Sequence, residues 1–461
     1  MDLFLYNTLS RTKEKFVPIE QGLPRIYVCG PTVYSYAHLG NARSVVVYDV
    51  LYRLLQKLYK KVMYVRNITD VDDKIIAAAK LAGRSVADIT TFYANAFHAD
   101  MRALYCLEPN IQPLATEHIQ EMIAIISELA TKGHVYEVDG EMYFDIRSYA
   151  AYGKLSGCNL DQIEAGARVD VKESKRHPAD FVLWKRASDE DDKILWDSPW
   201  GPGRPSWHIE CTAMSMKYLG PDFDIHGGGV DLQFPHHENE IACCAANDCQ
   251  FVRYWVHSGF LTVGGEKMSK SLGNIITVND LLKAGVPREA IRYALLMTHY
   301  HKPLDWNDEF LLNAKKSLNK LYGAILFTEK NSSKPEQAEA QANINTEFLS
   351  ALMDDMNTPR ALSALHSLAG QMNRCEDLQK KSMLAGELRS AAKFLGLLNL
   401  SASDWYTKDP DAEVELLIQE RHEARRQKNY TLADSIRAKL KQKGILLKDN
   451  PDGITDWYYE V

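Results

Sequence analysis

Near its start the chain alternates between short apolar runs and an apolar stripe at helical spacing. Residues 25–29 form an apolar run that ends at a Gly-Pro pair, and residues 62–68 form a second run. Between them, apolar side chains recur at positions 47, 50, 51, 54 and 58, the spacing of one helix face. Strand, helix and strand in this order predict a βαβ unit, in which the two strands are parallel.

Two later apolar runs extend the predicted sheet. Residues 223–226 and 253–257 are typical of strands, and a helical pattern that starts near residue 238 separates them. In an open parallel sheet, ligands bind beyond the carboxyl ends of the strands. Here these ends carry polar or small residues, namely Cys29, Thr69, Asp70, His226, the glycines at 227–229 and His257. The sequence therefore predicts a site along this edge of the sheet.

The pattern changes after residue 115. A helix at 117–132 and short strands at 141–145 and 181–184 predict an α+β insertion, and apolar residues keep helical spacing from 289 to 398. We therefore expect an α/β fold built from four parts. These are a Rossmann-like, doubly wound parallel-sheet domain (1–115 plus 205–300), an inserted connective domain (116–204), an α-helical bundle (301–400) and a small C-terminal α/β module (412–461).

Composition limits the class of protein without naming its function. The 461 residues are 46% hydrophobic and 25% charged, with a net charge of −7, as in an ordinary globular enzyme. The first residues do not resemble a signal peptide, and no apolar run approaches the roughly 18 residues of a membrane span. The eight cysteines are scattered and form no disulfide framework. We expect a cytoplasmic protein with reduced thiols and no membrane partner.

Two lysines three positions apart are the strongest chemical signal in the chain. Lys267 and Lys270 lie in the sequence KMSKS, with glycines at 264, 265 and 273 that allow the loop to move. Lysine binds phosphate as a point charge, so the pair predicts a clamp for a polyphosphate. A solvated basic turn is the plainer alternative.

A second phosphate-binding signal lies far upstream, in the first strand-to-helix connection. His38, Gly40 and Asn41 lie where exposed backbone N–H groups and the helix dipole attract anions. Gly40 allows close approach of the backbone, and His38 supplies a hydrogen-bond donor. A histidine at this position can also serve simply as a helix cap.

Four separated side chains form a candidate metal site. Cys29 ends the first strand, Cys211 lies in the sequence SWHIEC, and His236 and Glu240 are four residues apart on one predicted helix face. Two thiolates, one imidazole and one carboxylate suit zinc. His237 pairs with Glu240 nearly as well as His236 does. Two buried cysteines beside an amphipathic helix would explain the same pattern without a metal.

Several motifs resemble those of one enzyme family. HLGN at 38–41 with KMSKS at 267–271 resembles the HIGH and KMSKS signatures of class I aminoacyl-tRNA synthetases. Asn41 departs from that pattern, because an amide replaces the second histidine and cannot carry charge. Over the whole chain the sequence is similar to cysteinyl-tRNA synthetases, on GPTVY at 30–34, RNITDVDDK at 66–74, WHIEC at 207–211, DFDIHGGG at 222–229 and FPHHENE at 234–240.

This resemblance implies an enzyme that activates L-cysteine with ATP and transfers it to the 2′-hydroxyl of tRNA(Cys), with Mg²⁺ accompanying ATP. It implies one zinc ion that selects the substrate thiolate. By this resemblance, the zinc ligands are Cys29, Cys211, His236 and Glu240, and the catalytic residues are His38, Asn41, Lys267 and Lys270. The resemblance also implies nucleotide contacts from Gly40, Gly227, Gly229, Asp231 and Lys270. It implies a cysteine pocket formed by Thr69, Trp207, His208 and His226.

The C-terminal module is the expected binding site of the second substrate. Residues 421–443 contain eight Lys or Arg against two acids, with Tyr430 among them. Basic side chains bind phosphates and aromatic rings stack on unpaired bases, although most such charge runs are solvated helix faces. By resemblance to the anticodon-binding domain of the family, we expect tRNA contacts from Asp434, Arg437, Asp452 and Trp457.

Two rival functions share this catalytic core. A cysteine ligase that joins activated cysteine to a small-molecule amine would resemble the core but lack the basic tail, which this chain has. A catalytically silent paralogue would not need His38, Lys267 and Lys270, all of which are present. The resemblance further suggests a monomer.

Overall fold

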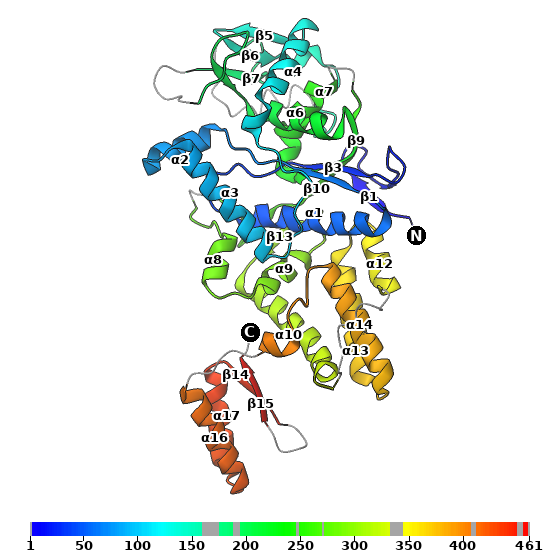
Figure 1. Ribbon diagram of the computed structural model, residues 1–461, viewed down its shortest axis with the longest axis vertical. Helices are drawn as coiled ribbons and strands as arrows, with labels where there is room; N and C mark the ends of the chain where they lie inside the picture. Colours follow the sequence, from blue (N-terminus) through cyan, green and yellow to red (C-terminus); the bar gives the residue numbers. More distant parts are fainter. Residues whose placement is uncertain are drawn as a thin grey trace. The chain divides into compact units, whose positions relative to one another are not determined.

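The structure is a computed structural model that describes residues 2–158, 175–187, 194–245, 249–269, 272–331, 344–406, 412–449 and 455–459 (Figure 1). The chain divides into two compact units. The first comprises residues 1–286, 295–307 and 350–359, and the second comprises residues 287–294, 308–349 and 360–461. No helix within the described ranges is long and apolar enough to cross a membrane.

A four-stranded parallel sheet forms the centre of the first unit. Its strands, in spatial order, are β10 (Phe251–Ser258), β9 (Asp222–Gly229), β3 (Arg25–Val28) and β4 (Met63–Arg66). Figure 1 shows α1 (Leu39–Leu58) and α6 (Trp207–Leu219) on opposite sides of this sheet. Because helices cover both faces, the strands are apolar along most of their length. The predicted βαβ unit and the doubly wound α/β class are confirmed.

The side chain of Tyr48 attaches α1 to the carboxyl ends of two strands. Its hydroxyl oxygen lies 2.6 Å from Val256 O in β10 and 2.9 Å from Gly228 O in β9, and it accepts the Gly228 N–H at 2.6 Å. A Cβ atom at Gly227 would lie 2.3 Å from the Tyr48 ring. Glycine is therefore needed at position 227 so that α1 can pack against the strand ends that carry the predicted site.

An antiparallel sheet is inserted between β4 and α6. Its order is β5 (Val135–Val138), β6 (Glu141–Phe144), β7 (Phe181–Arg186) and β8 (Gly203–Pro205), and α4 (Ile119–Thr131) precedes it. The predicted helix and both predicted strands are confirmed within a few residues. Buried side chains of both sheets, among them Tyr27, Phe144 and Trp184, belong to one hydrophobic cluster. The inserted sheet therefore shares its core with the parallel sheet.

Short elements complete the first unit. β1 (Phe4–Asn7) pairs with β2 (Thr12–Lys15), and β11 (Leu261–Val263) lies between β12 (Glu266–Lys267) and β13 (Leu304–Trp306). The helices are α2 (Asp73–Ala82), α3 (Val86–Ala103), α7 (Glu238–Ala245) and α8 (Val278–Lys283), with helical turns at Ala115–His118, Ile146–Ser148, Val230–Leu232 and Gln233–His237.

The chain after residue 287 is largely helical, which confirms the predicted helical bundle. Its helices are α9 (Arg288–Leu296), α10 (Asp308–Asn331), α12 (Thr346–Met353), α13 (Thr358–Arg374), α14 (Leu378–Phe394) and α15 (Ala402–Tyr406). The buried carboxylate of Glu289 accepts hydrogen bonds from the Tyr322 hydroxyl at 2.9 Å and from the Leu398 and Asn399 N–H groups at 2.8 Å. It thus links α9, α10 and the segment after α14.

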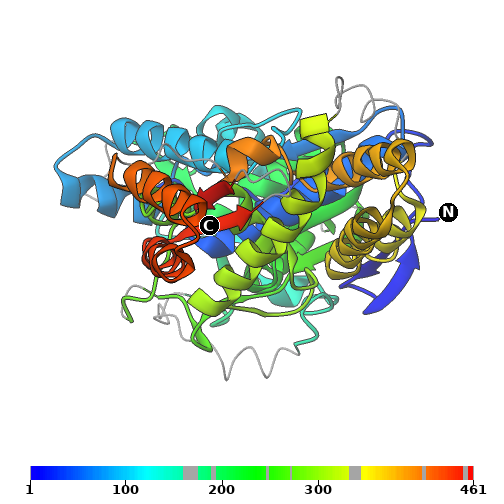
Figure 2. The ribbon, with the colours of Figure 1, turned by 90° about the horizontal axis from the view of Figure 1, so that it is seen from below.

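The last part of the chain forms the small α/β module that the sequence predicts. Helices α16 (Ala412–Arg426) and α17 (Tyr430–Gln442) lie side by side in Figures 1 and 2, and β14 (Ile445–Asp449) and β15 (Thr455–Tyr459) form an antiparallel hairpin. A separate small core joins them, made of Leu417, Ile436, Leu440, Ile445 and Leu447.

Candidate active site and metal centre

Six side chains meet near the carboxyl ends of β3 and β9. They come from the end of β3, from β9, from α6, from the turn Gln233–His237 and from α7, and they are Cys29, His226, Cys211, His236, His237 and Glu240. The two histidines lie in a turn ahead of α7, which begins at Glu238, rather than within the helix. His236 Nε2 nevertheless lies 3.1 Å from Glu240 Oε1, so the predicted pairing is present.

The first possible ligand set is the one that the sequence favours. One ligand atom from each of Cys29, Cys211, His236 and Glu240 lies within 4.8 Å of the others. The two sulfur atoms are 3.6 Å apart, and Cys29 Sγ is 3.5 Å from Glu240 Oε1. These separations bring two thiols, an imidazole and a carboxylate to one point.

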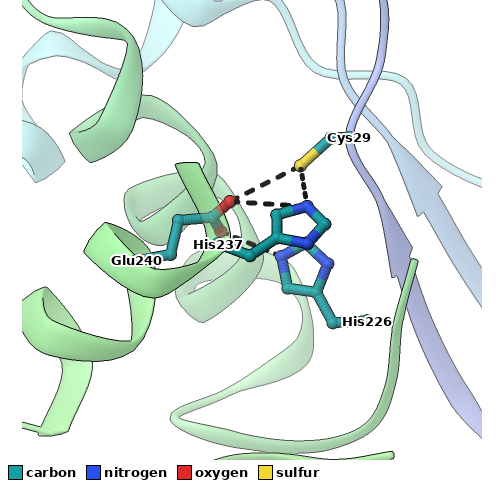
Figure 3. Close-up of side chains that lie close together, drawn as sticks. All are labelled: Cys29, His226, His237 and Glu240. Atoms are coloured by element: carbon teal, nitrogen blue, oxygen red, sulfur yellow. Dashed lines mark hydrogen bonds and ion pairs between the residues drawn. The ribbon is translucent and has the colours of Figure 1, made fainter. Parts of the chain in front are cut away.

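A second possible set uses the alternative histidine and shares two residues with the first (Figure 3). It consists of Cys29, His226, His237 and Glu240, again within 4.8 Å of one another. Cys29 Sγ lies 3.4 Å from His237 Nε2, and His226 Nε2 lies 2.9 Å from Glu240 Oε2. The sequence left open whether His236 or His237 is the metal ligand, and in the structure each of them belongs to one possible ligand set.

Burial disfavours the charged forms of the thiols and imidazoles in both sets. Desolvation raises the pKa of the Cys29 and Cys211 thiols and lowers the pKa of the His236 and His237 imidazoles. A divalent cation favours the thiolate and the neutral imidazole, so these groups fit a metal. Within the described part of the chain, the buried His236 Nε2 makes no hydrogen bond, and its neighbour at 3.1 Å is Glu240 Oε1, another ligand atom of the first set. The second sulfur ligand, Cys211, favours the first set, because two thiolates suit zinc.

The imidazoles of His236 and His237 are each held by a contact to the other ring nitrogen. His236 Nδ1 lies 3.1 Å from His208 Nδ1, and the Trp207 ring stacks on His236 with centroids 3.9 Å apart. His237 Nδ1 lies 2.8 Å from His257 Nε2, whose Nδ1 lies 2.8 Å from Thr8 Oγ1. Such contacts orient metal-binding histidines. The sequence analysis missed Thr8, and no local motif points to it.

A pocket of about 280 Å³ adjoins the metal cluster, and Cys29 and Trp207 line it. His38, Gly40, Asn41, Gly229, Asp231 and Lys267 line it as well, so the structure brings both predicted phosphate-binding segments to one cavity. Lys270 lies outside the described residues. Lys267 Nζ lies 4.9 Å from the centre of the Phe260 ring.

His38 is both a helix cap and a pocket residue. It is the N-cap of α1, and its Nδ1 accepts the Asn41 N–H at 3.2 Å. Burial lowers the pKa of His38, against the opposing effect of Asp231, so the ring is neutral near pH 7. A neutral ring whose Nδ1 accepts must carry its proton on Nε2, the nitrogen left to donate. A Cβ at Gly40 would lie 3.0 Å from this ring, so Gly40 makes room for His38.

Four of the residues predicted to contact the nucleotide or the cysteine substrate are not among those that line the pocket in the described part of the chain: Gly227, Thr69, His208 and His226. Thr69 is fully buried and donates to Glu210 Oε2 at 3.1 Å. His226 is also fully buried, and its ring stacks on Trp255 with centroids 4.6 Å apart. His226 belongs to the metal cluster itself, and His208 contacts His236 of that cluster.

The predicted tRNA residues are distributed over the C-terminal module. Asp434 and Arg437 are exposed on α17, and Trp457 pairs with Leu447 across the β14–β15 hairpin. Asp452 lies outside the described residues. The two exposed side chains are three positions apart, so they share one face of the helix.

Family models match most of the chain. Residues 15–316 match the model described as tRNA synthetases class I (C) catalytic domain, and residues 347–399 match the DALR domain. The first match contains both sheets, the metal cluster and the pocket.

Curated relatives match over nearly the full length. A cysteine–tRNA ligase of Ehrlichia ruminantium (strain Welgevonden) is 51% identical over 460 residues, which cover 99% of this chain and 100% of the relative. One from Wolbachia pipientis wMel is 51% identical over 458 residues, covering 98% and 99%. One from Anaplasma phagocytophilum (strain HZ) is 50% identical over 460 residues, covering 98% and 99%.

Solved structures share the fold at low sequence identity. Methionyl-tRNA synthetase of Mycobacterium tuberculosis, in complex with methionyl-adenylate, has a TM-score of 0.56 at 16% identity over 81% of this chain and 90% of that chain. The LeuRS–tRNA–LeuAMS complex of Agrobacterium radiobacter K84 has a TM-score of 0.57 at 12% identity over 82% and 84%. By its catalytic-domain match and its full-length relatives, the chain belongs to the cysteine–tRNA ligase family of class I aminoacyl-tRNA synthetases.

Proposed function

We propose that the chain joins L-cysteine to tRNA(Cys) in two steps at this site. The observation that carries the proposal is the position of Cys29. It belongs to the candidate metal cluster and also lines the pocket that holds His38 and Lys267. A substrate sulfur at the cluster and a triphosphate in the pocket would therefore be neighbours.

Both steps are displacements that need no protein nucleophile. In the first, a carboxylate oxygen of cysteine bonds to the α-phosphorus of ATP, and the bond to the bridging oxygen breaks to release pyrophosphate. In the second, the 2′-hydroxyl oxygen of the terminal adenosine of tRNA bonds to the acyl carbon. AMP leaves, and the hydroxyl proton passes to the departing phosphate or to water. The protein contributes positioning and charge stabilisation.

The residues that would hold zinc are Cys29, Cys211, His236 and Glu240. A pocket of fixed shape separates near-isosteres such as cysteine and serine by only about a hundredfold. When bound, zinc would accept the substrate sulfur as a further ligand and so distinguish it from oxygen by its preference for thiolate. Trp207, which stacks on His236, closes the side of this site. Thr69, His208 and His226 would form the rest of the cysteine pocket beside the metal.

The pocket residues would act on the nucleotide. His38 donates through Nε2, and Lys267 and Lys270 contribute positive charge, as the charge on the phosphates redistributes during displacement. Asn41 adds an uncharged amide donor to the same wall. Asp231 and Gly229 border the ribose, with a carboxylate that can accept its hydroxyl groups. Gly227 has an indirect role, because its missing side chain makes room for the Tyr48 ring that packs α1 against β9. Mg²⁺ would accompany ATP.

Cysteine-dependent exchange of pyrophosphate into ATP, followed by charging of tRNA(Cys), tests the function. Both activities are expected, with discrimination against serine well above about a hundredfold. Exchange without charging would favour a ligase for a small-molecule amine, and the absence of exchange would contradict both enzymes. A monomer that acts in the cytoplasm is also our proposal, supported by family membership alone.

Removal of residues 412–461 should separate the two steps. Cysteine-dependent exchange is expected to stay within about twofold of the full chain. The kcat/KM for tRNA should fall about tenfold or more, because the module carries exposed basic side chains such as Arg437. Charging at the rate of the full chain would contradict a tRNA role for the module.

A further inference from the structure

A buried arginine on α1 makes contacts that the function proposed above does not use. Arg43 follows His38 by five residues and is only 1% exposed. Its Nη1 donates to Gly259 O at 2.8 Å and to Phe260 O at 2.7 Å. Its Nη2 donates to three carbonyl oxygens of a second segment, those of His299 at 3.2 Å, Tyr300 at 3.3 Å and Lys302 at 2.5 Å. One guanidinium group therefore joins two separate segments of the chain to α1.

These contacts need an arginine in particular. Within the part of the chain that the structure describes, every hydrogen bond of Arg43 goes to a backbone carbonyl oxygen and none to a carboxylate. Burial lowers the pKa of Arg43 to about 10, which leaves the group protonated at pH 7. A buried charge is costly unless hydrogen bonds satisfy it. Only the planar fork of arginine has a separate nitrogen for each segment.

The two segments lead into the small sheet that carries Lys267. Residues 259–260 come directly before β11, and residues 299–302 come shortly before β13. β11 pairs with β13 in parallel and with β12 in antiparallel register, where Thr262 lies opposite Lys267. Arg43 therefore holds the start of two strands of this sheet, one of which pairs with the strand of Lys267.

The chain beyond the lysine loop is attached to the same part of α1. The Leu39 N–H donates to Ile276 O at 2.9 Å, and the Val278 N–H donates to Ala37 O at 3.1 Å. The chain is therefore anchored to the start of α1 both before and after Lys267. The anchor after it consists of backbone contacts, whereas the anchor before it depends on one side chain.

The joint at Arg43 is tightly packed. The Gly259 N–H donates to Tyr300 O at 2.7 Å, so the two segments also contact each other. A Cβ atom at Gly259 would lie 2.5 Å from Lys302 O, and the three atoms nearest to it all belong to the backbone of residues 301–302. A small displacement of one segment would therefore displace the other.

We propose that Arg43 is a positioning residue for cysteine activation, which fixes Lys267 on β12 relative to His38 at the start of α1. The proposal rests on the proposed function, since that function places both side chains on the phosphates of ATP. Arg43 is not among the residues that line the pocket in the described ranges, so it acts through the strands that it holds. A shift of about 1 Å in a group that faces the reaction can lower the rate about a hundredfold.

Replacement by lysine tests this role. Arg43→Lys keeps the charge, but its single nitrogen cannot bridge both segments. The kcat of cysteine-dependent pyrophosphate exchange should fall about 10- to 100-fold. The KM for cysteine and the zinc content should stay unchanged, because Arg43 belongs to neither candidate metal set. Titration of active sites, as adenylate formed per chain, should count the full number of sites, each working slowly.

A double-mutant cycle identifies the group through which Arg43 acts. Added to Lys267→Ala, the change Arg43→Lys should lower exchange by less than about threefold, because the group that it positions is already absent. Effects of independent sites would multiply to within about twofold. The same large loss in both backgrounds would therefore refute the proposal.

A second buried arginine provides the matched control. Arg292 on α9 is fully buried and donates to Leu395 O at 2.5 Å. Arg292→Lys should lower the temperature of unfolding but leave the kcat of exchange unchanged. If Arg43→Lys does not fold, Gly259→Ala disturbs the same joint from the other side. It should show the same loss of kcat, again reduced to less than about threefold in the Lys267→Ala background.

The outcomes separate this proposal from the proposed function. Fewer competent sites with a normal rate per site, in Arg43→Lys or in Gly259→Ala, would show a role in folding alone. That result would refute the positioning role and leave cysteine activation intact. If the unmodified protein shows no cysteine-dependent exchange, the proposed function itself fails.

Discussion

Cys211→Ser is expected to bind zinc at least about a hundredfold more weakly and to lose cysteine-dependent pyrophosphate exchange along with the metal. The Cys211 sulfur lies 3.6 Å from Cys29 Sγ, and a hydroxyl cannot replace a thiolate as a zinc ligand. Loss of a mere outer-shell partner already weakens metal affinity about 10- to 100-fold. Zinc per chain, measured by elemental analysis after dialysis against a chelator, gives the result independently of activity.

Two neighbouring histidines provide a matched pair for the same experiment. If the first ligand set holds the metal, His236→Gln should lose zinc as Cys211→Ser does, whereas His237→Gln should retain it. Both side chains are fully buried, so the two changes carry similar risk to folding. The opposite pattern, with zinc kept in Cys211→Ser and lost in His237→Gln, would assign the metal to His226 and His237 instead. Thermal unfolding of the metal-free proteins separates ligand loss from misfolding.

Local pattern was sufficient to predict the sheet and the helices that surround it. The strands of the parallel sheet are covered by helices on both faces, so each reads as an apolar run with a polar residue at its end. Cys29 directly follows β3, as this pattern predicts, whereas β9 continues three residues past His226 to Gly229, so the predicted end of that strand is wrong. The turn Gln233–His237 could not be predicted, because residues three and four apart satisfy helical spacing whether or not the backbone is helical.

Contacts between distant segments could not be predicted from the sequence alone. Thr8 reaches His257 across 249 positions, and no spacing rule connects them. Gly227 illustrates the opposite problem. A run of three glycines is typical of a ligand-binding loop, yet at position 227 the missing side chain makes room for Tyr48. Only the third glycine of the run, Gly229, lines the pocket. Internal packing at Gly227 and the pocket wall at Gly229 thus use the same residue type within one run of three.

His38→Ala is expected to lower the kcat of pyrophosphate exchange by about 10²- to 10³-fold, the usual effect of removing one donor that faces developing charge. The KM for cysteine and the zinc content should change little, since His38 belongs to neither candidate metal set. The variant should also lose about 1 kcal/mol of stability, because His38 Nδ1 caps α1 by accepting the Asn41 N–H.

His38→Asn separates these two roles. Asparagine is a good helix cap but is too short to replace the donor at Nε2, so this variant should unfold at the temperature of the unmodified protein while remaining as inactive as His38→Ala. Near-normal exchange in His38→Asn would show that capping alone explains the histidine. Low activity with full stability and full zinc content would instead place His38 on the nucleotide, since neither helix stability nor the metal would then account for the loss.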